Sequence, residues 1–120
     1  MILSLHHAQI TVPEGMEDQA QAFYCGVLGL AEAPKPEALA GRGGFWLQVG
    51  GQQVHVGTEA DVDRAATKSH LAYEVRDLAH WRRILEARTI AVLESVPIPG
   101  FDRFEFRDPF GNRVEFIQAL

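Results

Sequence analysis

A duplication constrains this chain more than any other feature of its sequence. The segment at residues 7–12, HAQITV, resembles the segment at residues 70–75, HLAYEV, and the two begin 63 positions apart. A second pair, GQQVHV at residues 51–56 and GNRVEF at residues 111–116, begins 60 positions apart. A repeat of this length indicates that one supersecondary unit occurs twice. The sequence therefore predicts two copies of one module.

Hydrophobic periodicity predicts the elements within each copy. Residues 5–12 alternate with a period of two, which is typical of a half-buried strand, and residues 16–28 carry apolar side chains at helical spacing. A glycine pair at residues 50–51 separates two strand-like runs, as it does in a hairpin. The second copy repeats this order with a strand at 69–75, a helix capped by Asp77, a weaker strand at 90–93, and strands at 101–107 and 113–117.

The predicted fold is therefore α+β, with two βαβββ modules. Module one spans about residues 1–57, a linker about 58–68, and module two about 69–120. A chain of 120 residues has the length of one domain. We expect the two modules to form a single domain.

Charge and composition exclude several partners. The net charge of −5 argues against nucleic acid and against an anionic membrane surface, because both attract basic proteins. No apolar run approaches the roughly 20 residues of a membrane-spanning helix, and no signal peptide is visible. The single cysteine, Cys25, cannot form an internal disulfide, so we expect the protein to be located in the reducing cytoplasm.

Repeat-equivalent positions carry potential metal ligands. His7 corresponds to His70, and His55 corresponds to Glu115. Apolar residues flank each of the four and must face the helix of their module, so strand alternation sends the four side chains to the opposite, concave face. Two paired modules would bring them together as a metal site. Nitrogen and oxygen ligands without thiolate suit Zn, Ni, Co, Mn or Fe(II).

Charged residues near the last strand pair offer weaker site candidates. Arg103 and Arg107 could hold an anionic substrate group, or they could be strand-surface charges. Glu105 could be an acid or base near the metal, or the solvated partner of one of these arginines. Trp46 could line a cleft, although aromatic side chains in a central strand more often belong to the core.

The other histidines and the cysteine are interpreted as structural. His6 has the wrong strand parity for the ligand face, and His80 is expected at the surface beside Trp81. Cys25 lies in the first predicted helix without a basic neighbour, so it is interpreted as a small core residue.

The whole pattern resembles the vicinal-oxygen-chelate superfamily, also called the glyoxalase/bleomycin-resistance/dioxygenase superfamily. The resemblance rests on the duplicated plan, the histidine that begins each half, the segment FYCGVLGL at 23–30 and the segment DPFGNRVE at 108–115. It implies a cupped mixed sheet and a metal that chelates a substrate through two neighbouring oxygens. His7, His70 and Glu115 match the most widespread ligand triad of the family. His55 occupies the position where glyoxalase I enzymes place a glutamate.

The resemblance implies a divalent-metal-dependent enzyme that acts on a small oxygen-rich metabolite, in a homodimer. A glyoxalase-like lyase or isomerase, with Glu115 as both ligand and catalytic base, is the favoured subclass. Two alternatives stay open. One is an extradiol-type dioxygenase, although the stretch at residues 104–107, FEFR, lacks the tyrosine typical of those enzymes. The other is a metal-free binding protein of the bleomycin-resistance kind.

Overall fold

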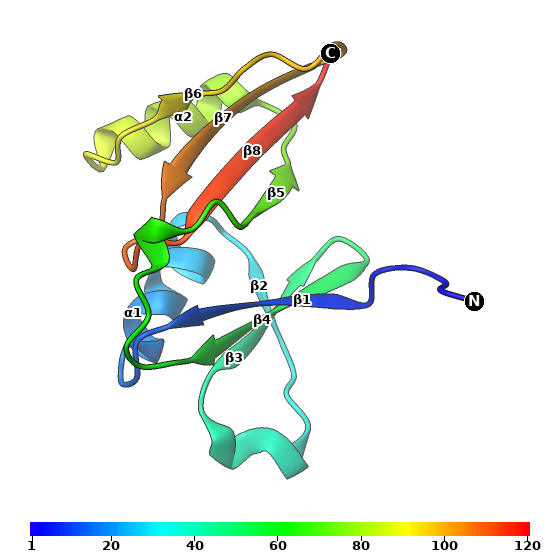
Figure 1. Cartoon of the computed structure of the whole chain (residues 1–120), viewed down its shortest axis with the longest axis vertical. Coiled ribbons are helices and arrows are strands. Elements are labelled where there is room, and N and C mark those ends of the chain that lie inside the picture. The colour runs from blue at the N-terminus through cyan, green and yellow to red at the C-terminus, as the bar shows by residue number, and fades with distance from the viewer. The chain divides into compact units, whose positions relative to one another are not determined.

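The structure is a computed structural model that describes residues 1–120. The chain divides into two compact units, Met1–Val62 and Asp63–Leu120 (Figure 1). Each unit contains one copy of the sequence repeat.

The N-terminal unit is a four-stranded mixed sheet with one principal helical segment. The sheet order is β1-β4-β3-β2, with β1 parallel to β4 and the other neighbours antiparallel. The elements, in chain order, are β1 (His7–Val12), α1 (Glu17–Gln21), a π-helical segment (Ala22–Val27), β2 (Ala31–Ala33), a 3-10 segment (Glu37–Arg42), β3 (Phe45–Val49) and β4 (Gln52–Thr58).

The C-terminal unit repeats this plan. Its order, β5-β8-β7-β6, has the same single parallel pair, here between β5 and β8. The elements are a 3-10 turn (Arg64–Ala66), β5 (His70–Glu74), α2 (Leu78–Ala87), β6 (Leu93–Glu94), β7 (Phe101–Arg107) and β8 (Arg113–Ala119). The prediction of an α+β fold with two βαβββ modules is therefore confirmed.

The first helix differs from its prediction in its winding. Residues 16–28 were expected to form one α-helix, but after Gln21 the backbone bonds span five residues, as when the Leu28 amide donates to the Phe23 carbonyl at 2.9 Å. This wider turn buries the adjacent Phe23 and Tyr24 together. Gly29, at φ 73°, ends the helix as the sequence indicated.

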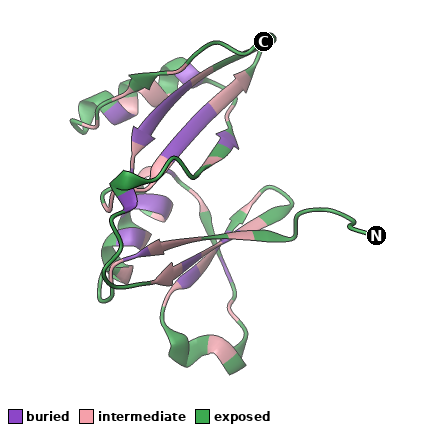
Figure 2. Ribbon diagram, in the orientation of Figure 1, coloured by how far each residue is buried: buried purple, intermediate pink, exposed green.

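The second helix covers one face of its sheet. Asp77 caps it, because the Asp77 carboxylate accepts a hydrogen bond from the His80 amide at 3.0 Å. Its Leu85 is fully buried, and its Trp81 ring contacts the edge of Phe116 on β8 at a centroid distance of 5.2 Å. Figure 2 shows the buried stretches of β7 and β8 that form this core.

The segments between elements hold two smaller differences. The weak strand expected at 90–93 is the two-residue β6, Leu93–Glu94. Within the expected linker, β4 continues to Thr58, and the 3-10 turn buries Arg64. None of the helices combines the length and the apolar character that a bilayer crossing requires.

Candidate metal centre

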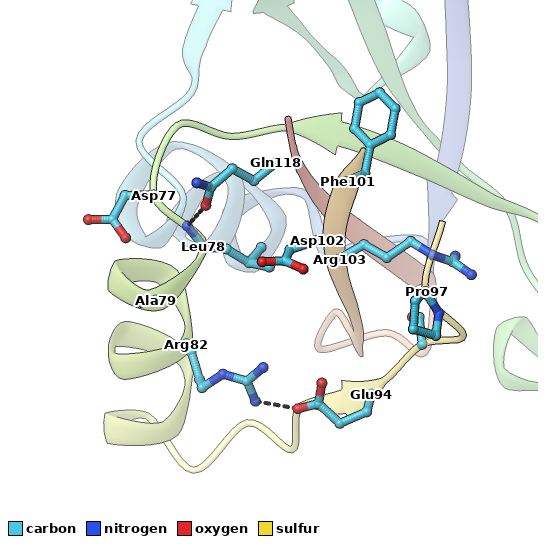
Figure 3. A pocket seen from close by; sticks show the side chains of 11 residues that line it. Asp77, Leu78, Ala79, Arg82, Glu94, Pro97, Phe101, Asp102, Arg103 and Gln118 are labelled. Carbon is cyan, nitrogen blue, oxygen red and sulfur yellow. Dashed lines mark hydrogen bonds and ion pairs between the residues drawn. The ribbon is translucent and has the colours of Figure 1, made fainter. Parts of the chain in front are cut away.

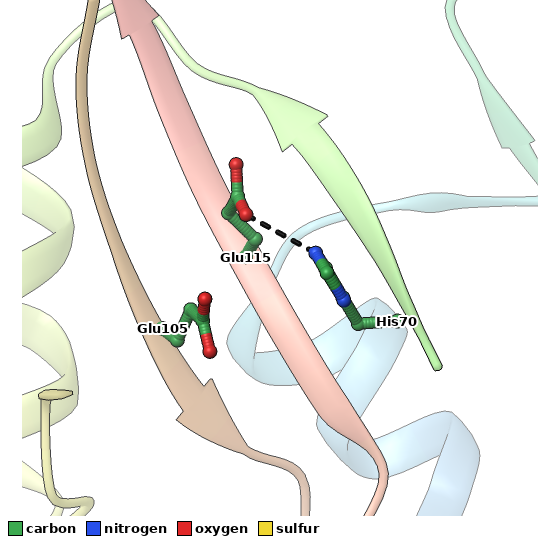
Figure 4. Close-up of side chains that lie close together, drawn as sticks. All are labelled: His70, Glu105 and Glu115. Carbon is green, nitrogen blue, oxygen red and sulfur yellow. Dashed lines mark hydrogen bonds and ion pairs between the residues drawn. The ribbon is translucent and has the colours of Figure 1, made fainter. Parts of the chain in front are cut away.

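One imidazole and two carboxylates cluster on the sheet of the C-terminal unit (Figure 4). His70 begins β5, while Glu115 and Glu105 face each other across the β7–β8 pair. One donor atom from each of the three lies within 4.8 Å of the others. Alternation along β7 and β8 turns the neighbouring Phe104 and Phe116 toward α2, so the cluster occupies the face opposite the helix.

Glu115 is buried, with 4% of its surface exposed, and one of its two oxygens makes all its contacts. Oε1 accepts a hydrogen bond from Nη1 of Arg103 at 3.0 Å and lies 3.2 Å from Nε2 of His70. In Figure 4, the other carboxylate oxygen points away from His70. That oxygen makes no hydrogen bond.

The backbone fixes the orientation of the His70 ring. Nδ1 lies 2.9 Å from the Lys68 carbonyl, and because a carbonyl can only accept, Nδ1 carries a proton. In the neutral ring, Nε2 then has a lone pair that faces the Glu115 carboxylate. Two acceptors at 3.2 Å repel each other unless a cation lies with them, which is either a proton on Nε2 or a metal ion.

Glu105 is already satisfied by another residue. Nε and Nη2 of Arg113 each donate to one of its oxygens, and the Ser95 hydroxyl donates at 3.3 Å. The hydrogen bond from Arg113 lowers the pKa of Glu105 despite its burial. Of the two roles that the sequence left open for Glu105, the solvated partner of an arginine needs correction: Glu105 is buried, and its main partner is Arg113 rather than Arg103 or Arg107. Arg113 lies two positions before Glu115 and shares its face, which was the available signal.

The two arginines that the sequence singled out have different surroundings. Besides its bond to Glu115, Arg103 donates from Nε and Nη2 to the Val96 carbonyl at 2.9 and 2.6 Å, and its side chain is 17% exposed. It also lies 3.9 Å from Glu105. Arg107 donates instead to the Gly111 carbonyl at 3.1 Å. Arg103 is thus part of the cluster rather than a surface charge, whereas Arg107 braces a turn.

The N-terminal unit places the equivalent histidines in an aromatic stack. The His55 ring lies between Trp46, at a centroid distance of 3.9 Å, and His7, at 4.1 Å. His55 Nε2 is 3.0 Å from the Gln53 side-chain oxygen and must donate to it. Burial, and then the nearby His7, lower the pKa of His55, which favours the neutral ring.

His6 contacts a predicted ligand that it was not expected to reach. Its Nδ1 lies 3.0 Å from Nδ1 of His7, so one of the two nitrogens must be a donor. This contact occupies Nδ1 of His7 and leaves its Nε2 for an ion. Strand parity could not reveal it, because the exposed His6 lies just outside β1, where alternation no longer applies.

Each unit also contains a cavity. In the C-terminal unit, a cavity of 540 Å³ lies between α2 and the β6–β7 edge (Figure 3). Arg82 and Glu94 form an ion pair across it at 2.5 Å, and none of the four predicted ligands lines it. The cavity of the N-terminal unit measures 280 Å³ and has Trp46 and His55 in its wall.

The remaining sequence candidates do not form a second reactive site. His80 is exposed, as expected, and its ring meets Trp81 at a centroid distance of 5.8 Å. Cys25 is half-buried rather than in the core, and burial followed by the nearby Glu32 raises the pKa of its thiol. A raised thiol pKa disfavours the nucleophilic thiolate.

A known family matches most of this chain. The sequence model of the Glyoxalase/Bleomycin resistance protein/Dioxygenase superfamily matches residues 4–116. The chain therefore belongs to this superfamily, as its sequence indicated. No functionally curated protein matches it.

Solved structures agree with this assignment. A protein from Bacillus anthracis described as a glyoxalase family protein is 37% identical, with coverage of 100% of this chain and 98% of that chain and a TM-score of 0.91. Two more distant structures share the fold. FosX from Listeria monocytogenes, a fosfomycin resistance protein in complex with Mn(II) and sulfate, has 15% identity, a TM-score of 0.79 and coverage of 100% and 93%. Lactoylglutathione lyase from Agrobacterium tumefaciens has 24% identity, a TM-score of 0.71 and coverage of 96% and 92%.

Proposed function

We propose that this protein is a divalent-metal-dependent enzyme that acts on a small oxygen-rich metabolite, as a glyoxalase-like lyase or isomerase. The observation that carries the proposal is the contact between His70 Nε2 and Glu115 Oε1 at 3.2 Å. This pair needs a cation, and its donors suit a metal such as Zn, Ni, Co, Mn or Fe(II). In addition to His70 and Glu115, we assign His7 as a ligand and His55 as the fourth candidate ligand, on the basis of the sequence repeat.

The charges of the cluster select which carboxylate serves the ion. Arg113 neutralises Glu105 through two hydrogen bonds, so Glu105 is unsuited to be a ligand. Glu115 has a single bond from Arg103 and an oxygen without any bond. The Lys68 carbonyl accepts a hydrogen bond from Nδ1 of His70 and so directs Nε2 toward the Glu115 carboxylate. Metal-bound histidines usually donate their second ring nitrogen in this way.

The residues of this cluster support proton transfer at carbon. A bound divalent ion would supply Lewis acidity that stabilises an oxyanion formed next to the acidic carbon. Glu115 would take the proton from the substrate and return it, while Arg103 holds Oε1 and leaves the other oxygen to act. Burial of Glu115 would limit competition from water.

The neighbouring strand favours this chemistry over oxygen chemistry. On β7 the side chains of Phe104 and Phe106 belong to the core, and the alternate positions carry Arg103, Glu105 and Arg107. No tyrosine or histidine of β7 can therefore assist a dioxygenase reaction from that face. The names of FosX and lactoylglutathione lyase are consistent with a small-molecule substrate, and we propose a homodimer as the functional form.

Turnover with restored metal tests the proposed function. Protein treated with a chelator would be reloaded separately with Zn, Ni, Co, Mn and Fe(II), then supplied with thiohemiacetals made from 2-oxoaldehydes and thiols. We expect turnover with at least one metal, and a loss of about 10²-fold or more in Glu115→Gln, the usual scale for a general base. Oxygen uptake with catechols and Fe(II) would instead indicate a dioxygenase. High-affinity binding of a compound without metal or turnover would indicate a binding protein.

A further inference from the structure

The 280 Å³ cavity of the N-terminal unit shares only His55 with the residues of the proposed metal site. Its floor is formed by Trp46 and His55, from β3 and β4. Its rim is formed by the segment between β2 and β3, which contributes Lys35 and Arg42. Since His55 also stacks on His7, the cavity begins beside a proposed metal ligand.

The lining of this cavity is cationic in a protein with a net charge of −5. Lys35 and Arg42 both line it, and no aspartate or glutamate does. The Arg42 guanidinium makes no hydrogen bond or ion pair, whereas Lys35 donates to the Gly43 carbonyl at 2.5 Å. A carboxylate does stand near the rim, because a Cβ placed on Gly43 would lie 3.7 Å from Oε2 of Glu17. The other Glu17 oxygen accepts from the Gly15 amide, so that carboxylate is partly satisfied.

Two glycines keep this cavity and its rim in place. Gly44 has φ +79°, and a Cβ there would collide with the Val56 carbonyl, so only glycine lets the rim segment enter β3 beside β4. A Cβ on Gly57 would lie 2.5 Å from the side-chain nitrogen of Gln9. The bare backbone at Gly57 therefore leaves room for the Gln9 amide, a neutral donor in the cavity wall.

The size and polarity of the cavity define a ligand class. At about 30 Å³ per water molecule, 280 Å³ corresponds to about nine waters, or to a small organic group. The Trp46 indole and Leu39 offer apolar contacts, and Arg42 offers planar paired donors that match a carboxylate or a phosphonate.

We propose that this cavity binds an anionic end of the substrate, a carboxylate or phosphonate carried on a short planar or apolar group. Arg42 and Lys35 hold the anion, and Trp46 packs against the group that carries it. This inference rests on the proposed function, since the metal-facing oxygens of the same substrate would lie toward His55 and His7. It narrows the substrate class to anionic metabolites.

Nuclear magnetic resonance of the two tryptophan indoles tests the proposal with phenylphosphonate as the probe. Chelator-treated protein labelled with ¹⁵N would be titrated with phenylphosphonate, with neutral benzyl alcohol and with inorganic phosphate. We expect phenylphosphonate to shift the Trp46 indole saturably and to leave the Trp81 indole in place. Trp46→Phe assigns the two signals.

Matched variants identify the anion contacts. Arg42→Gln should weaken phenylphosphonate about tenfold, the scale of one charge-assisted hydrogen bond, and Lys35→Gln should weaken it in the same direction. Arg88→Gln, which removes an exposed arginine of the other unit, should change nothing. The proposal would be overturned if phenylphosphonate left the Trp46 indole signal unchanged, or if benzyl alcohol bound as tightly as phenylphosphonate. It would also be overturned if Arg42→Gln bound phenylphosphonate with unchanged affinity.

The same variants separate this proposal from the proposed function. Metal binding by Arg42→Gln should equal that of the unaltered protein, because Arg42 is not a ligand. Loss of phenylphosphonate binding with metal binding retained supports the anion site. Metal binding that persists while phenylphosphonate never binds overturns the anion site alone. Failure to bind metal, with phenylphosphonate bound at Trp46, overturns only the proposed metal chemistry.

Discussion

Replacing Arg103 with glutamine should destabilise the metal-free protein and strengthen metal binding. Arg103 and Glu115 form a pair whose side chains are 17% and 5% exposed. Removing one partner of a buried pair costs about 3–5 kcal/mol. Because Arg103 keeps some solvent contact and His70 also faces Glu115, we expect the lower part of that range, about 3 kcal/mol. For a chain of this size that loss lowers the melting temperature by roughly 10 °C.

The effect on the metal has the opposite sign. The Arg103 guanidinium donates to Oε1 of Glu115 at 3.0 Å, so its positive charge repels any dication on the same carboxylate. Removing a unit charge at such short range should strengthen metal binding by at least about 1 kcal/mol, or about fivefold. The ion then replaces the missing cation, and added metal should restore most of the lost stability.

Calorimetric melting with and without metal, together with a metal titration, measures both effects. Arg107→Gln is the matched control, since it lies on the same strand and face but contacts only the Gly111 carbonyl. It should change metal affinity by less than about twofold, because an exposed or distant charge is screened. If Arg103→Gln instead weakens metal binding tenfold, Arg103 does not compete with an ion for Glu115, and the reasoning fails.

Three further predictions concern Glu105, the glycines at 44 and 51, and Asp77. Arg113 lowers the pKa of Glu105 below its ordinary value of 4.5. The ionised carboxylate therefore stabilises the fold above pH 4.5, and this stability is lost as the pH falls through the lowered pKa. In urea unfolding of metal-free protein, Glu105→Gln should lose less stability than the unaltered protein as the pH falls. Gly44→Ala should cost more than about 2 kcal/mol in denaturant unfolding because of its crowding and positive φ, whereas Gly51→Ala, with nothing within 4 Å, should cost less than 1 kcal/mol. Asp77→Ala removes the cap on the His80 amide and should cost about 1 kcal/mol in the same assay, while Asp77→Asn should retain most of it.

The duplication made most of the fold predictable from sequence. Equivalent segments implied equivalent modules, and the register agrees: Gln9 pairs with His55 as Ala72 pairs with Glu115. Hydrophobic periodicity predicted the local structure less well where tertiary packing determines the backbone conformation. The π-helical turn depends on the joint burial of Phe23 and Tyr24, which helical periodicity does not encode.

The faces of the candidate ligands were predictable, but their immediate partners were not. Period-two alternation assigns a face to each residue of a strand, which is why His70 and Glu115 share one side of the sheet. Which cation pairs with which carboxylate depends on side-chain reach across strands. The sequence therefore named Arg103 but not Arg113, whose paired hydrogen bonds to Glu105 leave Glu115 as the carboxylate that faces His70.

The central claim is that His70 and Glu115 hold a divalent ion, and metal stoichiometry tests it most directly. Chelator-treated protein would be dialysed at pH 7.5 against each of Zn, Ni, Co and Mn, and bound metal counted per chain for the unaltered protein, His70→Ala, Glu115→Ala and the control His80→Ala. We predict one ion per chain for the unaltered protein and His80→Ala, and affinity at least tenfold weaker in the other two variants, because each loses a ligand. Stoichiometric binding that survives both His70→Ala and Glu115→Ala, or no saturable binding of any metal, would contradict the claim.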